Sequence, residues 1–156
     1  MYSFKRKASR LPDYKYNTTN AYFITICTDK RKKLFWTDWR AVVDCPANVP
    51  LTTIGQIVAQ CITAISIYYP TVTVDHCVIM PDHVHLLLQI NPVQGVSSPS
   101  ISTIINQMKG AASKKAGFSI WQKGFYDHVI RNQSDYKDAW IYIEGNPGKM
   151  NEDEVY

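Results

Sequence analysis

Residues 71–90 read TVTVDHCVIMPDHVHLLLQI, in which two apolar runs are separated by a Pro-Asp turn. The runs predict two strands, 71–80 and 83–90, that pair as a hairpin. Because side chains alternate along a strand, His83 and His85 should point to the same face of the sheet. Two neighbouring neutral imidazoles can bind one divalent metal ion; the alternative is that each ring is buried with its own structural partner.

The segments on either side of the hairpin alternate between strand and helix patterns. Residues 21–28 are rich in β-branched and aromatic side chains, which predicts a strand, and isoleucines recur at helical spacing in 53–69. A helix beginning near Ser100, a strand over 120–131 and a final helix capped by Ser134 follow. The predicted fold class is α+β, a ferredoxin-like split β-α-β antiparallel sheet with two helices on one face. The other face is left for the histidines and for the additional C-terminal helix.

The 156 residues fit a single domain, and their 46% hydrophobic and 19% charged residues are ordinary for a globular protein. We expect a basic N-terminal arm over 1–20, the C-terminal helix over 134–146 and a short tail over 148–156. No run approaches the ~18 apolar residues of a membrane span, and no apolar core of an export signal follows the N-terminus. The sequence therefore predicts a cytoplasmic protein with no membrane partner.

Basic residues are segregated along the chain. Ten of the 17 lysines and arginines lie between Lys5 and Arg40, the other seven lie from Lys109 onward, and none lies in 41–108. Two such blocks that fold against each other would form a surface for nucleic acid, although any one cluster can be plain solvated charge. The candidate DNA-binding residues are Lys5, Arg6, Lys7, Arg10, Lys30, Arg31, Lys32, Lys33, Lys114, Lys115 and Arg131.

The C-terminal helix carries the candidate nucleophile. At about 100° per residue, Asp138, Tyr142 and Asn146 form one line along the helix, beside but distinct from an apolar stripe that includes Tyr136. Tyr142 is therefore the tyrosine best placed to face the histidines, and Tyr126 and Tyr136 are its competitors.

The chemistry of a tyrosine nucleophile calls for a metal ion. A phenol with a pKa near ~10 attacks poorly at neutral pH, and a phosphodiester needs a cation to take up developing charge. Nitrogens of His83 and His85 with the amide oxygen of Asn146 would suit Mg²⁺ or Mn²⁺ and leave positions for phosphate oxygens. Asn146 has an alternative reading as an ordinary helix stop before Pro147. Attack by Tyr142 would give a 5′-phosphotyrosine and a free 3′-hydroxyl.

Four segments together resemble the REP-associated tyrosine transposases, within the single-tyrosine HUH (His-hydrophobic-His) superfamily. The first is the strand 21–28, and the second is VIMPDHVHLLL over 78–88, which all HUH nucleases share in outline. The others are WQKGFYDHVIRN over 121–132 and YIEGNP over 142–147, whose Tyr-x-x-x-Asn-Pro pattern is the more specific. The resemblance covers most of the chain.

The resemblance implies a role for each matching position. His83 and His85 match the metal ligands, Tyr142 matches the nucleophile and Asn146 matches a further ligand. Proteins similar to this one are transposases that cut and rejoin single-stranded DNA near hairpins with Mg²⁺ or Mn²⁺. Many are dimers, so a homodimer is open here as well as a monomer.

Three other functions remain open on the sequence alone. An HUH replication initiator or relaxase would use the same chemistry, commonly with a third histidine or a second nucleophilic tyrosine. A non-catalytic nucleic-acid-binding module on the same sheet would display aromatic rings on its open face. A hydrolase or zinc-binding protein that uses the histidine pair differently is the third.

Overall fold

The computed structural model describes residues 20–38 and 50–145. The predicted basic arm over 1–20, apart from Asn20, and the tail over 148–156 lie outside the described residues. The elements are β1 (Asn20–Cys27), the 3-10 turn η1 (Asp29–Arg31), α1 (Thr53–Tyr68), β2 (Val72–Ile79), β3 (His83–Ile90), α2 (Ile101–Ala116), β4 (Tyr126–Ile130) and α3 (Gln133–Gly145).

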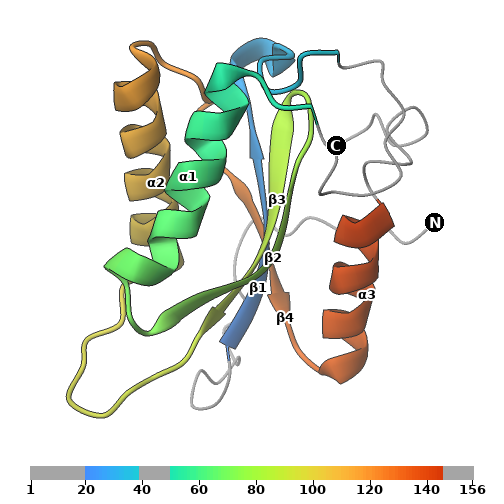
Figure 1. Ribbon diagram of the computed structural model, residues 1–156. Helices are drawn as coiled ribbons and strands as arrows, with labels where there is room; N and C mark the ends of the chain where they lie inside the picture. The colour runs from blue at the N-terminus through green and yellow to red at the C-terminus, as the bar shows by residue number, and fades with distance from the viewer. Residues whose placement is uncertain (1–19, 39–49, 146–156) are drawn as a thin grey trace.

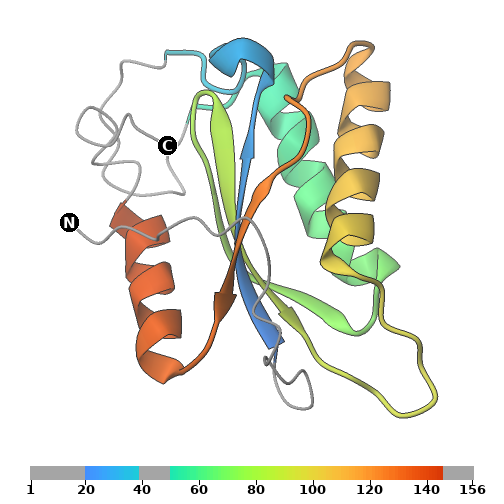
Figure 2. The same cartoon turned by 180° about the vertical axis from the view of Figure 1, so that it is seen from behind.

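The four strands form one antiparallel sheet in the order β2-β3-β1-β4. Helices α1 and α2 lie side by side on one face, and α3 lies alone on the opposite face (Figures 1 and 2). This is the predicted ferredoxin-like arrangement, and the expected position of the C-terminal helix is confirmed.

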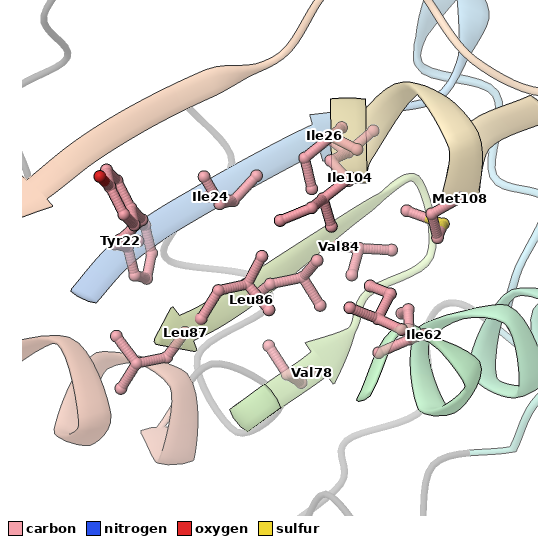
Figure 3. Packing of buried hydrophobic residues seen from close by; sticks show 14 of the residues in the cluster. Tyr22, Ile24, Ile26, Ile62, Val78, Val84, Leu86, Leu87, Ile104 and Met108 are labelled. Carbon is pink, nitrogen blue, oxygen red and sulfur yellow. The ribbon is translucent and has the colours of Figure 1, made fainter. Parts of the chain in front are cut away.

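Strand β3 runs through the middle of the molecule and is covered on both faces. Its residues Val84 and Leu86 belong to the face under α1 and α2, and Leu87 points to the other side (Figure 3). By alternation along the strand, Leu88 shares the face of Val84 and Leu86. All four are fully buried, and each such side chain contributes roughly 2 kcal/mol of hydrophobic stabilisation. Burial on both sides explains why 83–90 reads as a nearly continuous apolar run.

Two predicted boundaries differ in the structure. The strand predicted over 120–131 is shorter in the structure. It begins at Tyr126, as β4, because the chain turns at Gly124, which has a φ of 81°. The last helix begins at Gln133 rather than after Ser134, because the side chain of Asn132 accepts a hydrogen bond from the backbone N–H of Asp135 at 2.8 Å. Neither shift moves the predicted functional residues.

Within 20–38 and 50–145, no helix combines the length and the apolar character that crossing a membrane requires.

Candidate metal and nucleophile site

His83 and His85 lie side by side on the face of the sheet that α3 covers. Both residues are buried, and their ring centroids are 4.8 Å apart with the ring planes at 72°. Their neighbours across the β1–β3 ladder are Cys27 and Thr25, respectively. The expectation that the two histidines share one face is confirmed.

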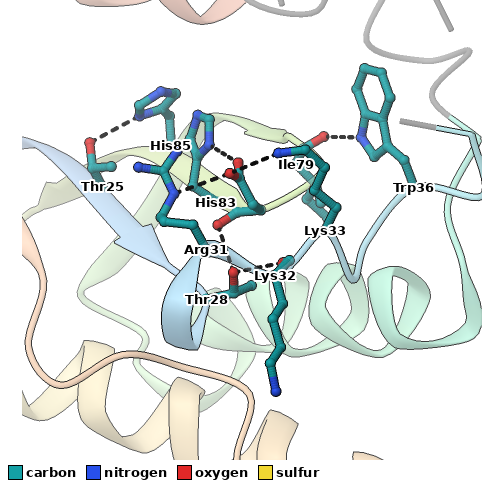
Figure 4. Close-up of polar contacts among 10 residues, drawn as sticks. Thr25, Thr28, Arg31, Lys32, Lys33, Trp36, Ile79, His83 and His85 are labelled. Atoms are coloured by element: carbon teal, nitrogen blue, oxygen red, sulfur yellow. Dashed lines mark hydrogen bonds and ion pairs between the residues drawn. The ribbon is translucent and has the colours of Figure 1, made fainter. Parts of the chain in front are cut away.

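Each histidine is oriented through its Nδ1 atom. Nδ1 of His83 lies 2.8 Å from Oδ1 of Asp82, and Nδ1 of His85 lies 3.0 Å from Oγ1 of Thr25 (Figure 4). A carboxylate can only accept, so the proton of a neutral His83 sits on Nδ1 and its lone pair sits on Nε2. Such second partners commonly fix the orientation and tautomer of metal-binding histidines.

Asp82 joins the histidine pair to the basic turn after β1. Its Oδ2 accepts from Nε of Arg31 at 3.1 Å and lies 3.7 Å from Nζ of Lys33. Its backbone carbonyl accepts from the backbone N–H and the hydroxyl of Thr28, at 3.0 and 3.2 Å. Burial alone would raise the pKa of this carboxyl, but hydrogen bonding and charge from His83 and Arg31 outweigh it and lower the pKa to about 2. The carboxylate therefore stays ionised throughout the physiological range.

The lowered pKa of Asp82 predicts an acid-sensitive contribution to folding. Its stabilisation is fully present above the ordinary carboxyl pKa of 3.8 and is lost as the pH falls through about 2. The shift corresponds to about 2 kcal/mol. We expect the gap in unfolding free energy between the wild-type protein and Asp82→Asn, measured by urea denaturation, to narrow from pH 6 to pH 2. A gap that stays constant over this range would contradict the assignment.

The ring of Tyr142 packs directly against the histidine site from α3. Its centroid lies 5.3 Å from that of His85 and 5.7 Å from that of Phe23, in edge-to-face geometry with both. Phe23 in turn stacks on His85, with centroids 5.1 Å apart. The half-buried Tyr142 and the histidines of the same chain thus form one cluster, as the predicted line along the helix requires.

The two competing tyrosines are placed differently. The hydroxyl of Tyr136 donates to Oδ2 of Asp75 at 2.7 Å, and burial together with this carboxylate raises the pKa of Tyr136 well above its ordinary value. Tyr126 lies on β4 opposite Thr25 and is more than a third exposed. Of the three, Tyr142 makes the ring contact with His85.

The histidine pair fits two ligand positions for a divalent ion. The donors are two adjacent imidazoles whose Nδ1 atoms are already engaged within the protein, as is usual for metal-binding histidines. Asn146, the expected third ligand, lies outside the described residues. In the described part of the chain, no three His, Cys, Asp or Glu side chains gather into a metal-binding group.

The predicted DNA-binding residues that the structure describes lie in three places on the fold. Lys30 and Lys32 are exposed on and beside η1, whereas Arg31 and Lys33 pair with Asp82. The exposed Lys114 and Lys115 belong to the last turn of α2, at the same end of the molecule as η1 (Figures 1 and 2). Arg131 follows β4 at the opposite end of the sheet, and Lys5, Arg6, Lys7 and Arg10 lie outside the described residues.

Sequence reasoning missed three residues of the site: Phe23, Thr25 and Asp82. Alternation along 21–27 places Phe23 and Thr25 on one face, but the register that sets them beside His85 depends on pairing with a strand 60 residues away. The sequence marked Pro81-Asp82 only as a turn. In the structure the carboxylate of Asp82 also forms a hydrogen bond with Nδ1 of His83.

Comparisons with known proteins give relatives along the whole chain. No family model matches. An uncharacterised protein of Haemophilus influenzae is 29% identical over 173 residues, which cover 97% of this chain and 93% of that protein. The REP-associated tyrosine transposase of Escherichia coli K12 is 33% identical over 72 residues, which cover 46% of this chain and 42% of the relative.

One solved structure shares the fold over nearly the whole chain. It is a REP-associated tyrosine transposase bound to a REP hairpin, with a TM-score of 0.64 and 24% identity over 96% of this chain and 74% of that one. The overall fold is thus common to both proteins. In about half of its sequence the chain is similar to a REP-associated tyrosine transposase, and over nearly its whole length it shares the fold of another.

Proposed function

We propose that this protein is a DNA transposase that cleaves and rejoins single-stranded DNA near hairpins, with Tyr142 as the nucleophile. The observation that carries the proposal is the contact between the Tyr142 ring and His85, with His83 beside it and each histidine oriented by a hydrogen bond. A phenol next to two oriented imidazoles provides a nucleophile beside two metal-binding groups, which suits metal-assisted cleavage of a phosphodiester.

The reaction is a transesterification at phosphorus. The Oη atom of Tyr142 forms a bond to the phosphorus, the bond from phosphorus to the 3′ oxygen breaks, and the 5′ end remains as a phosphotyrosine ester. The phenol loses its proton to solvent and the 3′ oxygen gains one, so a free 3′-hydroxyl is released. Because one phosphoester replaces another, the reverse attack by a 3′-hydroxyl rejoins DNA without an energy source.

His83 and His85 would hold Mg²⁺ or Mn²⁺, with Asn146 as the expected further ligand. The bound ion would polarise the phosphate oxygens and take up the charge that develops on them. Asp82 and Thr25 keep the two rings in place for this role. The burial of both histidines keeps the rings fixed before DNA arrives.

The DNA partner is inferred from charge and from the related structure. Lys30 and Lys32 are exposed on and beside η1. Arg31 of the same turn binds Asp82, which in turn binds His83. The relative of the same fold was solved with a REP hairpin bound. A single strand with a hairpin is therefore the substrate that we would test first.

The covered sheet face disfavours a non-catalytic RNA-binding module. Such a module stacks bases on aromatic rings of the open face. Here that face carries Phe23, which is only 4% exposed and lies under Tyr142 of α3. The ring of Tyr142, the candidate nucleophile, therefore covers the ring of Phe23 on which a base would have to stack.

The test is covalent capture. Purified protein mixed with a 5′-flanked, REP-like hairpin oligonucleotide and Mn²⁺ should give an adduct that survives SDS, and the oligonucleotide 3′ of the cut should be the one attached. Omitting the metal or replacing the single strand by a fully paired duplex should remove the adduct. Metal-dependent cleavage without an attached strand would instead indicate a hydrolase and overturn the proposal.

A further inference from the structure

A bulge in β2 turns two consecutive side chains toward α3. Val74 lies opposite Leu88 and His76 lies opposite Leu87, so Asp75 is an extra residue in the strand. Residues opposite each other share a face, which assigns Val74 to the α1/α2 side and His76 to the α3 side. In a regular strand Asp75 and His76 would point to opposite faces, and the bulge lets both reach α3.

Both of these side chains bind α3. Oδ2 of Asp75 accepts from the hydroxyl of Tyr136 at 2.7 Å, and Nε2 of His76 lies 2.6 Å from Oε1 of Glu144. The backbone N–H of Cys77 donates to Nδ1 of His76, so the proton of a neutral ring sits on Nε2 and is donated to Glu144.

The attachment brackets Tyr142 along the helix. Tyr136 lies six residues before it and Glu144 lies two residues after it, and between them the ring of Trp140 packs on His76 with centroids 4.3 Å apart. Helix α3 buries two residues, Ala139 and Ile143, whereas α1 buries five. The polar contacts to β2 therefore add to these two buried side chains, and to the partly buried Tyr136 and Tyr142, in holding α3 on the sheet.

We propose that Asp75 and His76 are positioning residues, which hold α3 on the sheet so that Tyr142 stays beside His85. They act through α3 and touch neither the histidine pair nor the DNA in this role. The inference rests on the proposed function, because it concerns the placement of the proposed nucleophile.

The test separates positioning from folding. A double variant, Asp75→Ala with Glu144→Ala, removes both acceptors, and a matched one, Asp75→Asn with Glu144→Gln, keeps acceptor oxygens at both sites. Asn91→Ala is the control, because it removes a hydrogen bond to Thr73 of the same strand that does not involve α3. Two quantities are measured: hydrogen exchange of the α3 amides without DNA or metal, and the single-turnover rate of adduct formation at saturating hairpin DNA.

We expect the alanine double variant to exchange the α3 amides faster and to form the adduct about tenfold more slowly, with unchanged DNA affinity. The Asn/Gln double variant should recover most of the rate, and Asn91→Ala should match the wild-type protein in both measurements. Faster exchange with a wild-type rate, or unchanged exchange, would overturn the positioning role. If the wild-type protein forms no adduct, the proposed function fails, and the exchange data still decide whether these residues hold α3.

Discussion

Replacing Tyr142 with phenylalanine should abolish the covalent adduct with hairpin DNA, a loss of at least ~1000-fold in the rate of cleavage. The substitution removes one oxygen atom, the one that would attack phosphorus, and keeps the ring. The ring contacts with Phe23 and His85 therefore remain, and we expect the unfolding free energy to change by less than ~1 kcal/mol. DNA affinity, measured by fluorescence anisotropy with the same oligonucleotide, should stay at the wild-type value.

The chain offers two matched controls for this substitution. Tyr136→Phe removes the hydroxyl that binds Asp75, and Tyr126→Phe removes a hydroxyl from a partly exposed residue of β4. Both variants should still form the adduct, Tyr136→Phe more slowly if α3 is held as proposed. A Tyr142→Phe protein that still becomes attached to DNA would show that another residue is the nucleophile.

The β2–β3 hairpin could be predicted because its signals are local. The predicted strand 83–90 agrees with β3 at both ends, and the shared face of His83 and His85 follows from alternation alone. The helical projection likewise separated Tyr142 from Tyr136, and the structure places them on His85 and on Asp75 respectively. Each of these inferences needed only the geometry of one element.

The contacts that make the residues a site could not be predicted, because they join distant parts of the chain. Thr25 reaches His85 through the β1–β3 register, and His76 reaches Glu144 across 68 positions. The extra residue at Asp75 breaks the period of β2, for which the sequence predicts one uninterrupted strand over 71–80. Simple alternation along the predicted strand puts Asp75 and His76 on opposite faces, whereas the bulge lets both reach α3.

The pairing of Arg31 and Lys33 with Asp82 illustrates a limit of reading charge from sequence. The run Lys30-Arg31-Lys32-Lys33 looks uniform, yet Arg31 and Lys33 pair with a buried carboxylate, and Arg31 is the one member that is partly buried. The backbone of this turn is also unusual, because Lys30 and Arg31 both have φ values in the left-handed region, 55° and 53°. Such conformations cost energy in non-glycine residues and persist where surrounding contacts enforce them.

The second large effect should come from the histidine pair itself. Replacing both His83 and His85 with alanine should abolish Mn²⁺ binding, because it removes the two imidazoles that the described site offers. Isothermal titration of the DNA-free protein measures this directly and does not depend on activity. Adduct formation should be lost together with metal binding.

Thermal unfolding gives an independent measure of the same site. A metal that binds the folded state alone stabilises it by about 2.7 kcal/mol at a concentration one hundred times its Kd. For a chain of this size this amounts to a Tm increase of roughly 5–10 °C, which we expect for the wild-type protein and not for the double variant.

Thr25→Val should weaken metal binding at the same site less than the two histidine substitutions do. It keeps both rings and removes the hydroxyl 3.0 Å from Nδ1 of His85, so the ring loses the partner that orients it. Loss of such a partner commonly weakens metal binding by about 10- to 100-fold. We therefore expect Thr25→Val to need more Mn²⁺ for the same Tm increase and to form the adduct once metal is in excess. An unaltered Mn²⁺ affinity in both Thr25→Val and the histidine double variant would place the metal elsewhere and leave the histidine pair as a structural feature of the sheet.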